Sequence, residues 1–261
     1  MPIIMVENGY VFKLNSKNTK KHKLKFFSLL LVCCIAIVAI LMLVFSKFNI
    51  SALVGISKFE VYGGSSFYAV SLNSGYTFAE VSQNANMVKL QDGAGYVYQN
   101  GNTYYLLANI YRSKQDAERV LNNLTEYDAS VVEIKFDKLV LNSNFSSTEI
   151  KELRRGIEIV DRFFETIHEI TISFDMGEIL DAEVRQKLQI FKETCQENKE
   201  TFAKAFKDSG ENIVTYVKIF HNEIISNLSA LIISKNLSSD LKYISISTLV
   251  SFERFQQNVR K

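Results

Sequence analysis

The side chains that could do covalent or metal chemistry are few and scattered. His168 and His221 lie in expected helices, and neither has a second histidine at the spacing of metal ligands. Cys195 stands alone in another expected helix, while Cys33 and Cys34 are adjacent, and adjacent cysteines do not bridge each other. A glycine-rich phosphate loop and a nucleophile elbow are also missing from the sequence. We therefore expect no enzymatic activity, no metal site and no cofactor.

Composition excludes further classes of function. The chain has 261 residues, 47% hydrophobic and 22% charged, with a net charge of +2. This is ordinary globular composition for one or two domains, without the basic excess of a nucleic-acid-binding protein. We expect no nucleic-acid partner. The positive charge is concentrated near the start of the chain, in Lys13, Lys17, Lys20, Lys21, Lys23 and Lys25.

The stretch from Phe67 to Ile134 predicts strand, helix, strand, strand, helix, strand. Two sets of side chains alternate along each of two strands, as on the two faces of a sheet. They are Tyr68, Val70 and Leu72 against Phe67, Ala69 and Ser71 in Phe67–Leu72, and Tyr104, Leu106 and Ala108 against Tyr105, Leu107 and Asn109 in Tyr104–Tyr111. Two apolar stripes with helical spacing follow these strands, and they comprise Phe78, Val81, Ala85 and Val88, then Ala117, Val120, Leu121 and Leu124. One stripe per helix predicts a two-layer sandwich, in which both helices cover one sheet face and the other face is free.

The residues of this stretch resemble a known family. The pieces Phe67–Leu72, Tyr104–Tyr111 and Ser113–Val120 are similar to the SPOR domain, the sporulation-related repeat of bacterial cell-envelope proteins. The resemblance covers residues 66–136. It implies a ferredoxin-like βαββαβ fold and binding of peptidoglycan glycan strands through the open sheet face. It also implies action in cell division or sporulation.

The resemblance places candidate glycan-binding residues on the open sheet face. They are Ser71, Asn73, Tyr96, Tyr98, Tyr105, Leu107 and Asn109. Tyrosine rings would stack on sugar rings, and the serine and asparagine side chains would bond to hydroxyl and N-acetyl groups. Two alternatives stay open. The tyrosines could be cross-strand pairs that stabilise the sheet, and Leu107 suggests a face covered by another part of the chain or by a partner.

An uncharged, apolar run extends from Phe26 to Phe45. A helix of about twenty residues spans about 30 Å, the thickness of the hydrocarbon core of a bilayer. The lysines before it predict that residues 1–25 are cytoplasmic and that everything after Ser46 is extracytoplasmic. A buried helix of a soluble protein and a cleaved signal peptide are the alternatives. We expect a single-pass protein of the bacterial cell membrane, which contacts lipid through Phe26–Phe45, with residues 46–65 as a linker.

Residues 147–259 have a different period. Apolar residues recur at steps of three and four, and the breaks at Asp175–Gly177, Asp208–Gly210 and Asn236–Ser239 divide the region into about four helices. Short connections favour an antiparallel helical bundle.

Together, these patterns predict an α+β chain. Its parts are one transmembrane helix, a ferredoxin-like domain with two helices on one face of an antiparallel four-stranded sheet, and an all-α C-terminal bundle. The expected function is that of a membrane-anchored peptidoglycan-binding protein, with division or sporulation envelope proteins as further partners. The alternative is a membrane-anchored protein-interaction scaffold whose SPOR-like fold does not bind glycan. A third hypothesis, an enzyme in the C-terminal region, has no catalytic constellation to support it.

Overall fold

The computed structural model describes residues 4–7, 10–13, 57–125 and 127–260. The chain divides into two compact units, Met1–Ser57 and Lys58–Lys261. In the first unit, strands β1 (Ile4–Glu7) and β2 (Tyr10–Lys13) form an antiparallel hairpin. The second unit holds everything that follows.

A four-stranded antiparallel sheet is the centre of the second unit. Its strands, in chain order, are β4 (Ser65–Gly75), β5 (Tyr96–Asn100), β6 (Thr103–Tyr111) and β7 (Ser130–Phe136). In space the order is β5-β6-β4-β7, so the two longest strands are central. Irregular pairing near Ser71 shifts the register between β4 and β6.

Three short helices cover one face of this sheet. They are α3 (Phe78–Ser82), α4 (Ala85–Leu90) and α5 (Lys114–Leu121). The Thr77 side chain caps α3, and the Ser113 side chain caps α5 by accepting from the Asp116 backbone amide. The apolar stripe expected for one helix is therefore shared by α3 and α4, which contribute Val81 and Val88 to the core.

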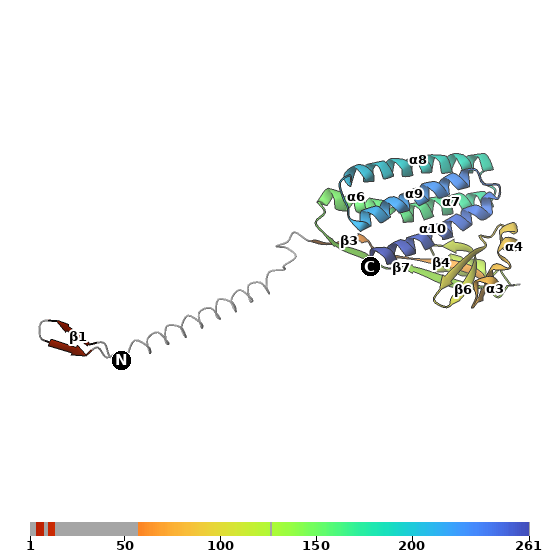
Figure 1. The fold of residues 1–261 in the computed structure, drawn as a ribbon. Helices are drawn as coiled ribbons and strands as arrows, with labels where there is room; N and C mark the ends of the chain where they lie inside the picture. The colour runs from red at the N-terminus through yellow and green to blue at the C-terminus, as the bar shows by residue number, and fades with distance from the viewer. Residues whose placement is uncertain (1–3, 8–9, 14–56, 126, 261) are drawn as a thin grey trace. The chain divides into compact units, whose positions relative to one another are not determined.

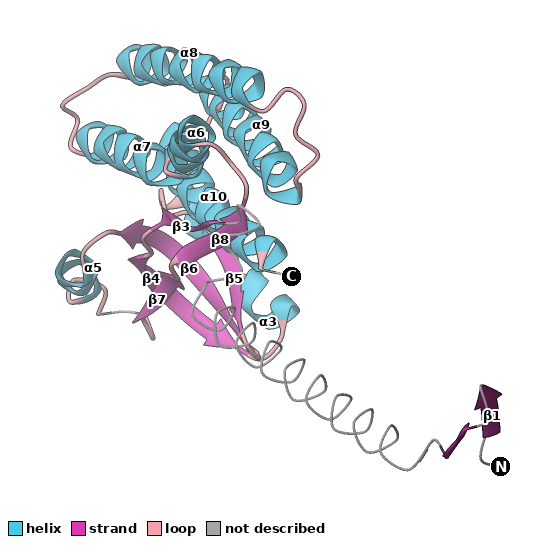
Figure 2. Ribbon diagram, turned by 90° about the vertical axis from the view of Figure 1, so that its left-hand side faces the viewer, coloured by secondary structure: helices cyan, strands magenta, loops and turns pink. Residues whose placement is uncertain are grey.

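Long helices cover the opposite face. They are α6 (Ser147–Ile157), α7 (Ile159–Asp175), α8 (Asp181–Ala205), α9 (Asn212–Ile232) and α10 (Leu237–Val259). Figure 1 shows these helices as a layer above the sheet, with α10 nearest to it, and Figure 2 shows the sheet between this layer and the short helices. The first expected helix of the region is divided into α6 and α7 at Glu158.

The bundle and the sheet share one hydrophobic core. The Phe67 ring of β4 meets Phe164 of α7 with centroids 4.6 Å apart, and the Phe136 ring of β7 meets Phe252 of α10 at 5.2 Å. The predicted free sheet face is thus wrong: the bundle covers it. The physical reason is that this face is apolar, since Ala69 and Leu107 join the phenylalanines there, and an apolar face must be buried.

A two-stranded sheet completes the layer arrangement. Strand β3 (Ser57–Tyr62) pairs with β8 (Leu139–Ser143). Phe59, Val61 and Leu139 belong to the core shared by the sheet and the bundle. Part of the stretch expected to be a linker is therefore a strand.

The predicted fold class needs a further correction. The chain is α+β, yet none of the helices in the described residues has the length and apolarity needed to cross a membrane. Phe26–Phe45, where such a helix was expected, lies outside the described residues. Residues 58–260 therefore form a three-layer unit of short helices, sheet and bundle, and not a two-layer domain followed by a separate bundle.

Candidate functional site

The candidate glycan-binding residues lie mostly beneath the bundle. Ser71 and Leu107 are fully buried, and the Ser71 hydroxyl donates to the Asn73 backbone carbonyl. The Tyr96 ring packs against Tyr243 of α10, with centroids 5.1 Å apart. The Tyr98 hydroxyl donates to Glu253 of the same helix at 3.3 Å.

The remaining candidates do not form an open sugar platform either. Tyr105 is half-buried and packs against the shared core. The Asn73 side chain accepts from the backbone amide of Ser74. Burial, followed by the charge of Glu253, raises the pKa of the Tyr98 phenol, as expected beneath a covering helix. Tyr98 and Tyr105 are cross-strand neighbours, and α10 covers the sheet face on which they lie.

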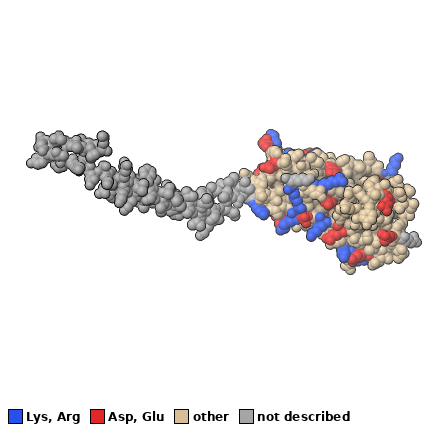
Figure 3. Space-filling model, turned by 60° about the horizontal axis from the view of Figure 1, so that its bottom comes forward, with Lys and Arg blue, Asp and Glu red and all other residues tan. Residues whose placement is uncertain are grey.

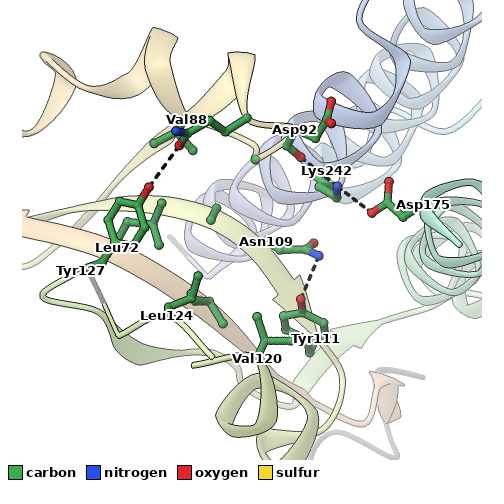
Figure 4. Close-up of a pocket in the computed structure, with 14 residues that line it drawn as sticks. Leu72, Val88, Asp92, Asn109, Tyr111, Val120, Leu124, Tyr127, Asp175 and Lys242 are labelled. Atoms are coloured by element: carbon green, nitrogen blue, oxygen red, sulfur yellow. Dashed lines mark hydrogen bonds and ion pairs between the residues drawn. The ribbon is translucent and has the colours of Figure 1, made fainter. Parts of the chain in front are cut away.

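A cavity of about 280 Å³ lies on the opposite face of the sheet, between α4 and α5 (Figure 4). Val70 and Leu72 of β4 and Ala108 of β6 form its apolar floor. Its walls include Val88 of α4 and Val120 and Leu124 around α5. Asn109 is the only candidate from the sequence that lines it.

The turn after α4 forms one edge of the cavity. Asp92 adopts a φ of 62°, which is uncommon for a residue with a side chain. Gly95 follows with a φ of 59°, and a Cβ atom there would collide with the Ala85 carbonyl of α4. The backbone therefore passes close to the start of α4 as it leads from the end of that helix into β5.

Polar groups from β6 line one side of the cavity. The Asn109 amide oxygen accepts from the Ile110 backbone amide at 2.8 Å, and its nitrogen donates to the Tyr111 hydroxyl at 3.0 Å. A phenol also carries one hydrogen to donate. Burial raises the pKa of Tyr111, so the hydroxyl keeps this hydrogen at neutral pH.

Lys242 of α10 closes the cavity on the bundle side. Its ammonium group lies 2.6 Å from the Asp175 carboxylate, 2.8 Å from the Asp92 backbone carbonyl and 2.9 Å from the Ser238 hydroxyl. The side chain is 9% exposed. All three ammonium hydrogens have acceptors, so this lysine joins three segments of the chain and is not a free base or nucleophile.

The chemically reactive side chains are placed in apolar surroundings. Burial lowers the pKa of His168 and of His221, and it raises the pKa of Cys195 to about 12, so this thiol stays protonated. Among the described residues, no three His, Cys, Asp or Glu side chains come together as metal ligands. The geometry of these groups suits core positions.

Sequence reasoning missed the cavity and its lysine. Lys242 lies directly beside the apolar stripe of its helix, next to Leu241, and its spacing of four from Ser238 was the available signal. In the sequence, Asp92 and Asp175 have the pattern of ordinary turn residues. Their contacts with Lys242 depend on how the bundle docks on the sheet, and a local pattern does not show this.

Comparison with known proteins adds no relative. No family model matches the chain, and neither the curated proteins nor the solved structures contain a match.

Proposed function

We propose that residues 58–260 act as a protein-interaction module. The single observation that carries this proposal is that the bundle occupies the sheet face required for glycan binding, with Tyr96, Tyr98 and Leu107 beneath it. A face already filled by the chain's own helices is not available to a sugar strand. This favours the scaffold alternative over the glycan-binding one.

The free energy of the buried contacts argues against a sheet face that α10 leaves in order to admit a ligand. Moving α10 away would expose Tyr98, Phe136 and Phe252, among others. Each large apolar side chain contributes about 1.5–3 kcal/mol when buried. The loss of three or four of them amounts to about 5–12 kcal/mol, close to the whole stability of a typical domain, which is about 5–15 kcal/mol.

Exposed apolar side chains support a partner elsewhere on the unit. Around α3 and α4, Tyr76 is 82% exposed, Phe78 58%, Met87 60% and Leu90 84%. Clusters of such side chains are typical of protein contact sites. Lysine, arginine and acidic side chains lie interspersed on the face in Figure 3, without the single-sign field that nucleic acid would require.

Photo-cross-linking in cells of the native host tests the proposal. A cross-linking amino acid would replace Leu90 of the full-length chain, and for comparison Ile219, an exposed residue of α9. We expect one discrete protein adduct from position 90 that is lost when Met87→Glu is added. Position 219 should give no such adduct.

Binding to purified cell walls provides the opposing measurement. We expect the full-length chain and its Tyr105→Ala variant to sediment equally with sacculi, with or without amidase treatment. Stronger retention on amidase-treated walls, lost in Tyr105→Ala, would establish the glycan function and contradict the proposal. The location in the membrane and the lipid and envelope-protein partners stay predictions of the sequence, and the module function does not depend on them.

A further inference from the structure

We propose that the outer edge of β7 pairs with the same edge of a second copy of this chain. In this pair Glu133 lies opposite Lys135 of the second copy, and the two four-stranded sheets join into one antiparallel sheet around a two-fold axis. The surface is separate from the exposed apolar side chains around α3 and α4. The inference therefore goes beyond the proposed function and does not rest on it.

Strand β7 lies at one margin of the sheet and has one free side. Its seven residues, Ser130–Phe136, are all in register with β4. In the described part of the chain, no strand pairs with the other side of β7, and Ser130, Glu133 and Lys135 are exposed. A row of unpaired backbone N–H and C=O groups of this kind is a template for a further strand.

Alternate residues of β7 direct their backbone groups to the free side. In an antiparallel strand, one residue directs its N–H and C=O groups to one neighbouring strand, and the next residue directs them the other way. Val131, Glu133 and Lys135 lie on the face of the short helices, since Val132 and Ile134 belong to the core shared with the bundle. A crossover such as the one from β4 through α3 and α4 to the parallel strand β5 is right-handed. With this handedness, L-residues of β7 on the face of the short helices direct their backbone groups away from β4.

The two charges at this edge have no ionic partner within the described chain. The Glu133 carboxylate accepts from the Ser66 hydroxyl at 2.8 Å, and neither Glu133 nor Lys135 takes part in an ion pair among the described residues. The two residues are two positions apart on one face of the strand, and both side chains are exposed. A second strand can therefore meet both charges without breaking an ion pair of the folded chain.

A two-fold pairing of β7 with itself has a register that joins opposite charges. If the axis passes beside Ile134, each Glu133 lies opposite a Lys135, and this contact occurs twice because a two-fold interface is isologous. Registers centred on Glu133 or on Lys135 place identical charges opposite each other, which is destabilising. In the favoured register, Glu133 and Lys135 are also the residues whose free backbone groups face each other, so each pair exchanges both of its N–H···O=C bonds. Charge and backbone geometry therefore select the same partner, a second copy of this strand.

The charges also restrict which strands can pair with this edge. A lysine on an edge strand opposes pairing with the sheets of other molecules. Glu133 makes the same lysine a favourable contact in one register with one partner. The edge is therefore protected against most strands and open to its own copy, which is the way in which charge pairs give specificity.

Energy transfer between donor-labelled and acceptor-labelled full-length chains measures the association. We expect Glu133→Lys and Lys135→Glu each to weaken self-association at least about tenfold, because both ion pairs of the symmetric contact become repulsions. A mixture of the two single variants should associate, because the lysines of one copy then meet the glutamates of the other. The double variant, Glu133→Lys with Lys135→Glu, should associate as the wild-type chain does. Glu200→Lys, at an exposed position of α8, is the matched control and should change nothing.

Disulfide formation tests the register. The Cα atoms of a hydrogen-bonded antiparallel pair are about 5.5 Å apart, which is a common distance across a disulfide. Every sample carries Cys33→Ala and Cys34→Ala, so that these thiols do not contribute. Under mild oxidation, a mixture of Glu133→Cys and Lys135→Cys chains should form a covalent dimer faster than either variant by itself.

Four results would each overturn the inference. They are the absence of energy transfer between wild-type copies, transfer that neither charge reversal reduces, failure of the mixture and of the double variant to restore association, and a cysteine mixture that reacts no faster than its components. Thermal transitions show whether each variant is folded, and the cysteine mixture still decides if a charge-reversal variant is not. Cross-linking at position 90 reports on a different surface, so failure here leaves the proposed function to its own test.

Discussion

At the scale of single residues, Lys242 connects three segments that are far apart in the sequence. Its ammonium group joins the start of α10, the end of α7 and the turn after α4. The turn after α4 also forms an edge of the cavity, so the same contact that docks the bundle also shapes the candidate site.

The substitution Lys242→Met tests this connection. Methionine keeps the packing of the stem but leaves the Asp92 carbonyl and the Asp175 carboxylate without their donor. We expect a loss of about 2 kcal/mol in the free energy of unfolding. This is less than the cost of breaking a fully buried ion pair, because water partly solvates the Asp175 carboxylate. Urea denaturation measures it. Lys235→Met, at an exposed position before α10, should change stability by less than about 0.5 kcal/mol.

His221 makes stability depend on pH. Its Nε2 lies 2.9 Å from the Gly156 carbonyl, and its Nδ1 is buried without a partner among the described residues. Burial lowers its pKa below the usual value of 6.5. The unfolded chain therefore takes up a proton on His221 at higher pH than the folded chain does. The contribution of the neutral His221 to stability is fully present above about pH 6.5, and it is lost as the pH falls below that value.

The variant His221→Gln keeps a donor for the Gly156 carbonyl and does not titrate. We expect its free energy of unfolding to fall less steeply between pH 6.5 and pH 5, with a slope smaller by up to about 1.4 kcal/mol per pH unit. Denaturant titrations at several pH values measure the slope. Identical slopes in the two proteins would show that His221 does not contribute.

At the scale of elements, α6 packs unusually closely against its neighbours. A Cβ atom added to Gly156 would lie 3.0 Å from the Phe202 ring of α8 and 3.1 Å from Val217 of α9. These distances are shorter than ordinary carbon contacts of about 3.5–4.0 Å. The glycine is therefore required by packing and not by backbone conformation.

We expect Gly156→Ala to destabilise the chain by about 1 kcal/mol. Alanine improves helix propensity by about 1 kcal/mol, but overpacking costs about 1–3 kcal/mol. Thermal unfolding measures the balance. Gly210→Ala is the control, because a Cβ atom there meets nothing within 4 Å and the change should be neutral or slightly stabilising. A stabilised Gly156→Ala variant would contradict the close packing.

Elements were easier to predict from the sequence than their arrangement. Alternating side chains predicted strands over Phe67–Leu72 and Tyr104–Tyr111, and β4 and β6 contain these stretches. Apolar spacing did not reveal the break at Glu158, because a stripe of threes and fours continues across it. Leu107, on the face expected to be open, indicated that the sheet could be covered. A local sequence pattern does not identify the segment that covers a sheet face.

At the scale of the whole molecule, the sheet and the bundle form one folding unit. Phe67 packs against Phe164 of α7 and Phe136 packs against Phe252 of α10, so the bundle-facing side of the sheet has no complete core without the bundle. We expect residues 66–136 alone to stay unfolded or to aggregate, as judged by circular dichroism and NMR dispersion. The full-length chain, as the control, should show these sheet signals. A folded, monomeric 66–136 fragment would contradict the shared core.

Folding of the sheet must also wait for distant residues. The helix α10 supplies Tyr243 and Phe252 to the face of strands that precede it by more than a hundred residues. During synthesis those strands leave the ribosome long before their cover does, and contacts between residues so far apart in sequence slow folding. The nascent sheet therefore has an apolar side that stays uncovered until α10 has been made.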